Sequence, residues 1–214
     1  MCFSVSSDLH YCSKGEDFIF LSLRTDRYFL LRGPPSDRFR RFLAGRASAY
    51  DIDWLVCRRL IVPGGESSAG FAAEPIAAPR SSILESPLPN VGIIGLAIAI
   101  RAQRAARRDL SRRGLGEIIG ELASAKGKTL PADIEINRTL AAAFQHARRY
   151  APAIDQCLVR GVAMRRLFHH RRLEARLVIG VTMPFSAHCW VQVGDAILTD
   201  PLDHVLPFQP ILVV

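Results

Sequence analysis

The chain has 214 residues, 49% of them hydrophobic and 22% charged, with a formal net charge of +8. This composition excludes a disordered chain, a collagen-like repeat and a coiled coil, and the length allows one large domain or two small ones. Residues 1–85 carry a net charge of +1 and residues 86–214 a net +7, almost all of it as arginine. A basic half is typical of proteins that contact nucleic acid, acidic lipid or an acidic polypeptide.

The first part of the chain has the pattern of a small sheet followed by helices. Residues 9–12 indicate a short strand, and residues 17–31 indicate a β-hairpin. Apolar residues at helical spacing then predict one helix between Ser36 and Gly45 and a second over residues 52–60. Three strands and two helices within about 65 residues are the elements of a small winged-helix module.

A loose segment separates this module from the rest. Residues 64–90 are rich in glycine, serine, alanine and proline, which is typical of a linker. We therefore predict two domains, residues 1–80 and residues 81–214. The second begins with helical patterns and ends with strands, which predicts the α+β class for the whole chain. The strands are expected at residues 175–181, 187–193 and 197–199.

The longest apolar run, residues 91–100, is too short to span a bilayer. Its simplest interpretation is a buried helix, but arginines at 101, 104, 107 and 108 also allow a peripheral membrane contact. The N-terminus lacks the pattern of a signal peptide, and the five cysteines include no CxxC pair. We therefore expect a cytoplasmic protein without disulfides, and no metal site.

Cys157 is the first candidate for chemistry. It follows Asp155, a predicted helix cap, so its thiol lies in the first helical turn, where free amides and the helix dipole stabilise a thiolate. The alternative is a buried structural cysteine.

His188 and Asp200 strengthen the catalytic interpretation of Cys157. Strand alternation places His188 on the face opposite Cys189, which we expect in the core. If Asp200 reached the second imidazole nitrogen, the three residues would form a nucleophile, a base and an orienting carboxylate. Regular pairing of His188 with Asp200 requires a three-residue loop that pairs Gln192 with Ala196, with positive φ at residue 194 or 195.

Other polar side chains are weaker candidates. Asp203 and His204 follow a proline in a predicted turn, so we expect solvated loop residues there. His169 and His170 offer no ligand spacing. The sequence contains no Walker motif and no GxGxxG, so no cofactor is predicted from a motif.

Four segments in order resemble the lasso-peptide biosynthesis B proteins, which are transglutaminase-like cysteine proteases. They are CLVRGVA at 157–163, LVIGV at 177–181, AHCWV at 187–191 and LTD at 198–200. The family more often has alanine where this chain has Cys189 and asparagine where it has Thr199. The resemblance covers about residues 150–205, and the first domain agrees with the family in layout alone.

The resemblance implies a transglutaminase/papain-like second domain and a winged-helix first domain that recognises the leader of a precursor peptide. Cys157 would then be the nucleophile, His188 the general base and Asp200 the orienting residue. An asparagine-synthetase-like lasso cyclase would be the partner enzyme. ATP has been linked to activity in this family, although no nucleotide site is predicted here.

The leader is expected to pair with the edge strand at residues 27–31, beside the helix at 52–60. For each candidate contact the alternative is core packing. Two other functions stay open: an acyltransferase with the same triad, and a DNA-binding regulator, which the few basic residues on the second helix disfavour. The candidate leader contacts are Tyr28, Leu30, Trp54, Leu55 and Arg58.

Overall fold

The computed structural model describes residues 2–64, 75–124, 130, 133–150 and 156–214. It divides into two compact units, Met1–Glu74 with Pro210–Leu212, and Pro75–Gln209 with Val213–Val214. Helices and several sheets occur together, which confirms the predicted α+β class. The linker predicted over residues 64–90 falls partly outside the described residues, and the assignment of separate functions to residues 1–80 and 81–214 stays a prediction.

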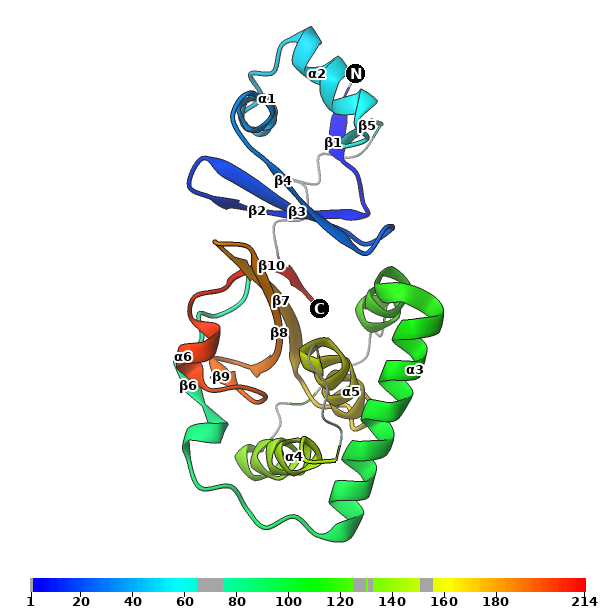
Figure 1. The fold of residues 1–214 in the computed structure, drawn as a ribbon, viewed down its shortest axis with the longest axis vertical. Coiled ribbons are helices and arrows are strands. Elements are labelled where there is room, and N and C mark those ends of the chain that lie inside the picture. Colours follow the sequence, from blue (N-terminus) through cyan, green and yellow to red (C-terminus); the bar gives the residue numbers. More distant parts are fainter. Residues whose placement is uncertain (1, 65–74, 125–129, 131–132, 151–155) are drawn as a thin grey trace. The chain divides into compact units, whose positions relative to one another are not determined.

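The first unit contains an antiparallel sheet in the order β2-β3-β4 and a separate pair, β1 with β5 (Figure 1). Its two helices follow β4 in the chain, as the sequence predicted. The name winged helix stays a prediction. The bounds are β1 Phe3–Val5, β2 Leu9–Lys14, β3 Asp17–Ser22, β4 Arg27–Leu31, α1 Pro34–Leu43, α2 Ala49–Cys57 and β5 Ile61–Pro63.

Aromatic and aliphatic side chains form the core of this unit. Phe20, Phe39 and Leu55 are completely buried, and the Phe20 and Phe39 rings meet edge to face with centroids 4.9 Å apart. Burying each of these side chains stabilises the fold by roughly 2–3 kcal/mol. Helix α2 begins earlier than predicted because Ser48 and Asp51 form a capping box at its start.

A five-stranded sheet has the order β10-β7-β8-β9-β6, and the strands β7, β8, β9 and β6 belong to the second unit. Helix α5 packs against β7 and β8 on one side and against α3 on another (Figure 1). No helix within the described ranges combines the length and apolar character that crossing a membrane requires. The bounds are β6 Ser81–Ser82, η1 Ile83–Glu85, α3 Ile93–Ser124, α4 Ile134–Ala147, α5 Gln156–His170, β7 Arg176–Thr182, β8 Ser186–Val193, β9 Ala196–Ile197, α6 Leu202–Val205 and β10 Gln209–Val213.

A glycine allows α5 to approach the sheet closely. A Cβ atom built on Gly161 would lie 2.6 Å from Leu177 Cδ1 and 2.9 Å from Cys189 Sγ, closer than real contacts allow. Cys157 lies four residues before Gly161, so both residues are on the same face of α5. The absence of a side chain at Gly161 therefore brings Cys157 to β8.

Candidate active site

The three candidate catalytic residues lie on three segments of the second unit. Cys157 is the second residue of α5, His188 the third residue of β8, and Asp200 follows β9 in a bend. The predicted cap, Asp155, lies outside the described residues. Cys157 is partly buried, while His188 and Asp200 are 9% and 2% exposed.

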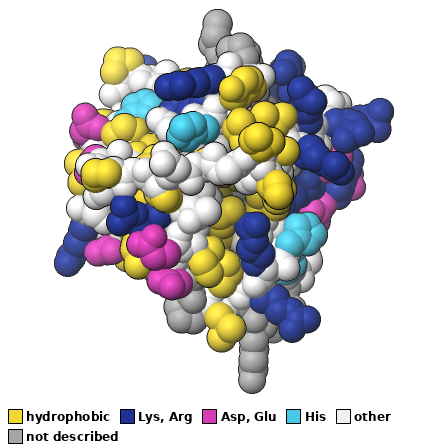
Figure 2. Space-filling model, turned by 90° about the horizontal axis from the view of Figure 1, so that it is seen from below, with side chains coloured by type: hydrophobic (Ala, Val, Ile, Leu, Met, Phe, Trp, Pro, Cys, Tyr) yellow, Lys and Arg dark blue, Asp and Glu magenta, His cyan; other side chains and the backbone are white. Residues whose placement is uncertain are grey.

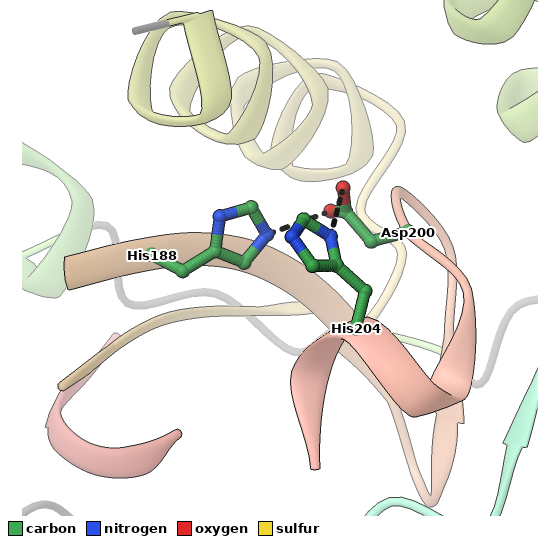
Figure 3. Close-up of side chains that lie close together, drawn as sticks. All are labelled: His188, Asp200 and His204. Carbon is green, nitrogen blue, oxygen red and sulfur yellow. Dashed lines mark ion pairs between the residues drawn. The ribbon is translucent and has the colours of Figure 1, made fainter. Parts of the chain in front are cut away.

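The structure brings these side chains together around His188. Its imidazole hydrogen-bonds to the Cys157 thiol, and its Nε2 atom lies 3.4 Å from Asp200 Oδ2 (Figure 3). Within the described part of the chain, neither Nε2 nor Oδ2 has another hydrogen-bond partner. The distance exceeds that of a tight charge-assisted hydrogen bond, and catalytic hydrogen bonds of this kind often shorten only when substrate binds.

The predicted hairpin register is wrong. Val193 pairs with Ala196 and Gln192 with Ile197, which leaves a two-residue turn in place of the three-residue loop. Gly194 has a φ of 57°, as expected for such a turn. Asp200 still reaches His188 because β9 ends at Ile197, and alternation no longer decides where later side chains point.

A short bent segment carries Asp200 back to β8. The Val191 amide of β8 donates a hydrogen bond to the Thr199 hydroxyl at 3.1 Å. In a continuing strand this amide would bond to a backbone carbonyl. The Ser82 hydroxyl donates to the Asp200 carbonyl at 2.7 Å. Both bonds are buried and hold the backbone on either side of the carboxylate.

Arg160 is a site residue that the sequence analysis did not single out. Its Nη2 atom donates to Asp200 Oδ1 at 2.7 Å, and both side chains are at least nine-tenths buried. Arg160 lies three residues after Cys157, so one helix carries both the nucleophile and the partner of Asp200. An arginine within the apolar sequence LVRGVA was the available signal, because a buried arginine needs an anionic partner.

The electrostatics favour a thiolate–imidazolium pair. Burial raises the pKa of the Cys157 thiol, but the His188 hydrogen bond and charge, the Cys189 amide and the Arg160 charge together lower it below its usual value. Burial lowers the pKa of His188. Its hydrogen bonds to Asp200 and Cys157 raise the pKa by more than burial lowers it, and the result is about 9. Burial raises the pKa of Asp200, while His188 and Arg160 hold it at about 2.

His204 also lies at this site, although a solvated loop residue was expected. Its side chain is 57% exposed on the short helix α6, with Nδ1 3.8 Å from Asp200 Oδ1. Its ring centroid is 4.6 Å from that of His188 (Figure 3). Donor atoms of His188, Asp200 and His204 lie within 4.8 Å of one another and could hold a metal ion. The expectation of no metal stays a prediction.

The candidate leader contacts are placed separately, in the first unit. Leu30 is exposed on β4, which lies at one end of the sheet order, and Tyr28 is half-buried on the same strand. The Arg58 guanidinium lies 3.9 Å from the centroid of the Trp54 ring. Leu55 is completely buried in the core, so it is not available to a bound peptide, and we withdraw it from the set.

The chain is similar to known proteins over the segment that carries this site. The family model for the transglutaminase-like superfamily matches residues 99–213, more than half of the chain, and the match includes Cys157, His188 and Asp200. Over 47 residues the chain is 44% identical to the microcin J25-processing protein McjB of Escherichia coli. That alignment covers 22% of this chain and 23% of McjB. No solved structure matches the chain.

Proposed function

Because the chain belongs to the transglutaminase-like superfamily, we propose that it is a cysteine peptidase that removes the leader from a lasso-peptide precursor. The observation that carries the proposal is His188, which contacts both the partly buried thiol of Cys157 and the carboxylate of Asp200. A nucleophile, a base and a group that orients the base are the parts that acyl transfer requires. The similarity to McjB, a microcin-processing protein, supports a peptide precursor as the substrate.

The proposed reaction starts from the Cys157 thiolate and the His188 imidazolium. The sulfur attacks the carbonyl carbon of the leader–core bond, and the Cys157 amide in the first turn of α5 stabilises the oxyanion. His188 then gives its proton to the leaving amine of the core, and the leader stays attached as a thioester. His188 next takes a proton from water, which attacks the thioester and releases the leader carboxylate and the thiol.

Asp200 keeps His188 in the orientation and charge state that this sequence needs. Its carboxylate faces Nε2, so the other imidazole nitrogen is directed at the sulfur. Arg160 holds the second carboxylate oxygen and keeps Asp200 ionised. Leader recognition by Tyr28, Leu30, Trp54 and Arg58, a lasso cyclase as partner, cytoplasmic location and a need for ATP remain parts of the proposal.

Replacing the nucleophile tests the chemistry. Cys157→Ala is expected to abolish cleavage of a synthetic precursor while the leader still binds, as measured by mass spectrometry and fluorescence anisotropy. Cys2→Ala is the matched control because Cys2 is exposed ahead of β1 and is not among the candidate catalytic residues or leader contacts. Cleavage by Cys157→Ala at the rate of the control would disprove the proposal.

The superfamily also favours a second candidate, an acyltransferase that passes the same thioester to an amine. Mass spectrometry distinguishes the two reactions, because hydrolysis adds the mass of water whereas transfer yields a crosslinked product. Incubation of the precursor with and without an added primary amine therefore decides between them.

A further inference from the structure

The first turns of α3 expose unusually large apolar side chains. Ile93 is 86% exposed, Ile94 78% and Ile98 38%. Isolated exposed leucines or isoleucines are common on soluble proteins. Adjacent ones at the end of a helix indicate a contact with a membrane or with another protein surface. Figure 2 views the molecule from the end where α3 begins, and hydrophobic side chains gather in the middle of this face.

Arginines follow these isoleucines along the same helix. Arg101, Arg104, Arg107 and Arg108 are all exposed. The ion pairs of α3 within the described ranges use Asp109, Arg113, Glu117 and Glu121, and none of the four arginines. Among the described residues, no acidic side chain forms an ion pair with any of these four arginines.

The apolar and basic side chains share one face of α3. Residues 94, 98, 101 and 108 follow the 3.6-residue repeat, and Arg104 lies at the margin of the same face. At 1.5 Å per residue, Arg101 lies about 10 Å along the helix axis from Ile94 and Arg108 about 21 Å. The helix tip is therefore apolar over about the depth to which interfacial helices enter a bilayer, and basic beyond it.

We propose that the start of α3 binds an anionic phospholipid surface, with Ile93, Ile94 and Ile98 inserted between the lipids. Arg101 then lies nearest the phosphates, and Arg104 and Arg108 follow about 5 and 10 Å farther along the helix. A basic side chain near an anionic surface contributes about 1 kcal/mol of attraction, which decreases with distance. A lipid surface fits better than a protein groove because Ile93 and Ile94, 86% and 78% exposed, lie in the first helical turn, and lipid can surround them without a complementary shape. This inference is independent of the proposed peptidase function.

Vesicle flotation tests the proposal with the full chain. The vesicles contain either phosphatidylcholine alone or phosphatidylcholine and phosphatidylglycerol at about three to one. The wild type is expected to float with the anionic vesicles and not with the neutral ones. Ile93→Ser/Ile94→Ser and Arg101→Glu/Arg104→Glu are each expected to lower the bound fraction at least about tenfold.

Two controls separate this surface from general effects. Ile134→Ser removes an isoleucine that is 55% exposed on α4, and Arg171→Glu reverses an exposed charge after α5. Both controls are expected to bind as the wild type does, and circular dichroism checks that every variant is folded.

Three results would overturn the proposal. The first is a wild type that does not float with anionic vesicles. The second is flotation of Ile93→Ser/Ile94→Ser equal to that of Ile134→Ser, since charge alone would then explain binding. The third is a wild-type dimer in light scattering that Ile93→Ser/Ile94→Ser converts to a monomer, because a second copy of the chain would then cover the isoleucines.

Discussion

Asp51 in the first unit and Asp200 in the second are both buried against an arginine. The two carboxylates differ in how many of their oxygens accept hydrogen bonds. Asp51 is 3% exposed and Asp200 2%, and each accepts a 2.7 Å hydrogen bond from an arginine Nη2. Asp51 also accepts from Arg41 Nε and from the amide and hydroxyl of Ser48, so both of its oxygens are occupied. Asp200 leaves Oδ2 to His188 at 3.4 Å.

The pKa values alone would not separate these carboxylates. The Arg41 hydrogen bond is the largest effect on Asp51, and with Ser48 it holds the pKa of that carboxyl far below its usual range. Asp200 is also held low, at about 2, by His188 and Arg160 against the effect of burial. The difference lies in the neighbour: Asp51 caps a helix with groups that do not titrate near neutral pH, whereas Asp200 faces an imidazole. A buried carboxylate with an oxygen directed at a histidine is therefore the one that we assign to catalysis.

The largest expected effect comes from removing each carboxylate charge. Asp200→Asn should lower kcat/KM for precursor cleavage by about 10³- to 10⁴-fold, because the amide no longer stabilises the His188 imidazolium. Asp51→Asn should destabilise α2 in urea denaturation but leave the alkylation rate of Cys157 unchanged. If Asp200→Asn cleaved the precursor with the kcat/KM of Asp51→Asn, Asp200 would have no catalytic role that Asp51 lacks.

Replacing the arginines separates the sites by stability. Arg160→Met leaves the Asp200 charge buried without its partner, which should cost about 3–5 kcal/mol of unfolding free energy and slow cleavage. Arg41→Met should cost less, because the Arg41 side chain is 46% exposed and Ser48 still binds Asp51. Urea denaturation measures both. Equal losses of unfolding free energy would mean that the deeper burial of Arg160 does not make its pair with Asp200 more important for stability than the Arg41–Asp51 pair.

The sequence predicted the elements of the site better than the path between them. The hairpin of β3 and β4, helix α5 and strands β7 and β8 follow from hydrophobic periods that their own residues carry. The register around Asp200 could not be predicted, because the alternation rule holds only while a strand continues, and β9 is two residues long. Strands β1, β5, β6 and β10 were also missed, since such short segments become strands only through distant pairing partners.

Alkylation of Cys157 at different pH values tests the charge state of the second site. The thiolate–imidazolium pair exists above the lowered pKa of Cys157 and below the pKa of His188, about 9. With the anionic reagent iodoacetate the rate should fall on both sides, because the thiolate is lost in acid and the imidazolium that attracts the reagent's carboxylate is lost in alkali. Asp200→Asn removes a group that raises the pKa of His188, so the alkaline limb should move down by at least about one pH unit. Asp51→Asn should leave the profile unchanged. An alkaline limb in the same place in Asp200→Asn would show that Asp200 does not stabilise the imidazolium.

The smallest effects concern the outermost partner at each carboxylate. Ser48→Ala removes a helix cap and should cost about 1 kcal/mol of unfolding free energy, with kcat unchanged. His204→Ala should do the reverse: its exposed ring contributes little to stability, but it packs on His188, so kcat should fall about threefold as His188 gains freedom. His204→Phe keeps a ring at that position and should restore most of kcat if packing is the cause. Loss of stability in His204→Ala as large as that in Ser48→Ala, with kcat unchanged, would place His204 with the structural partners of Asp51.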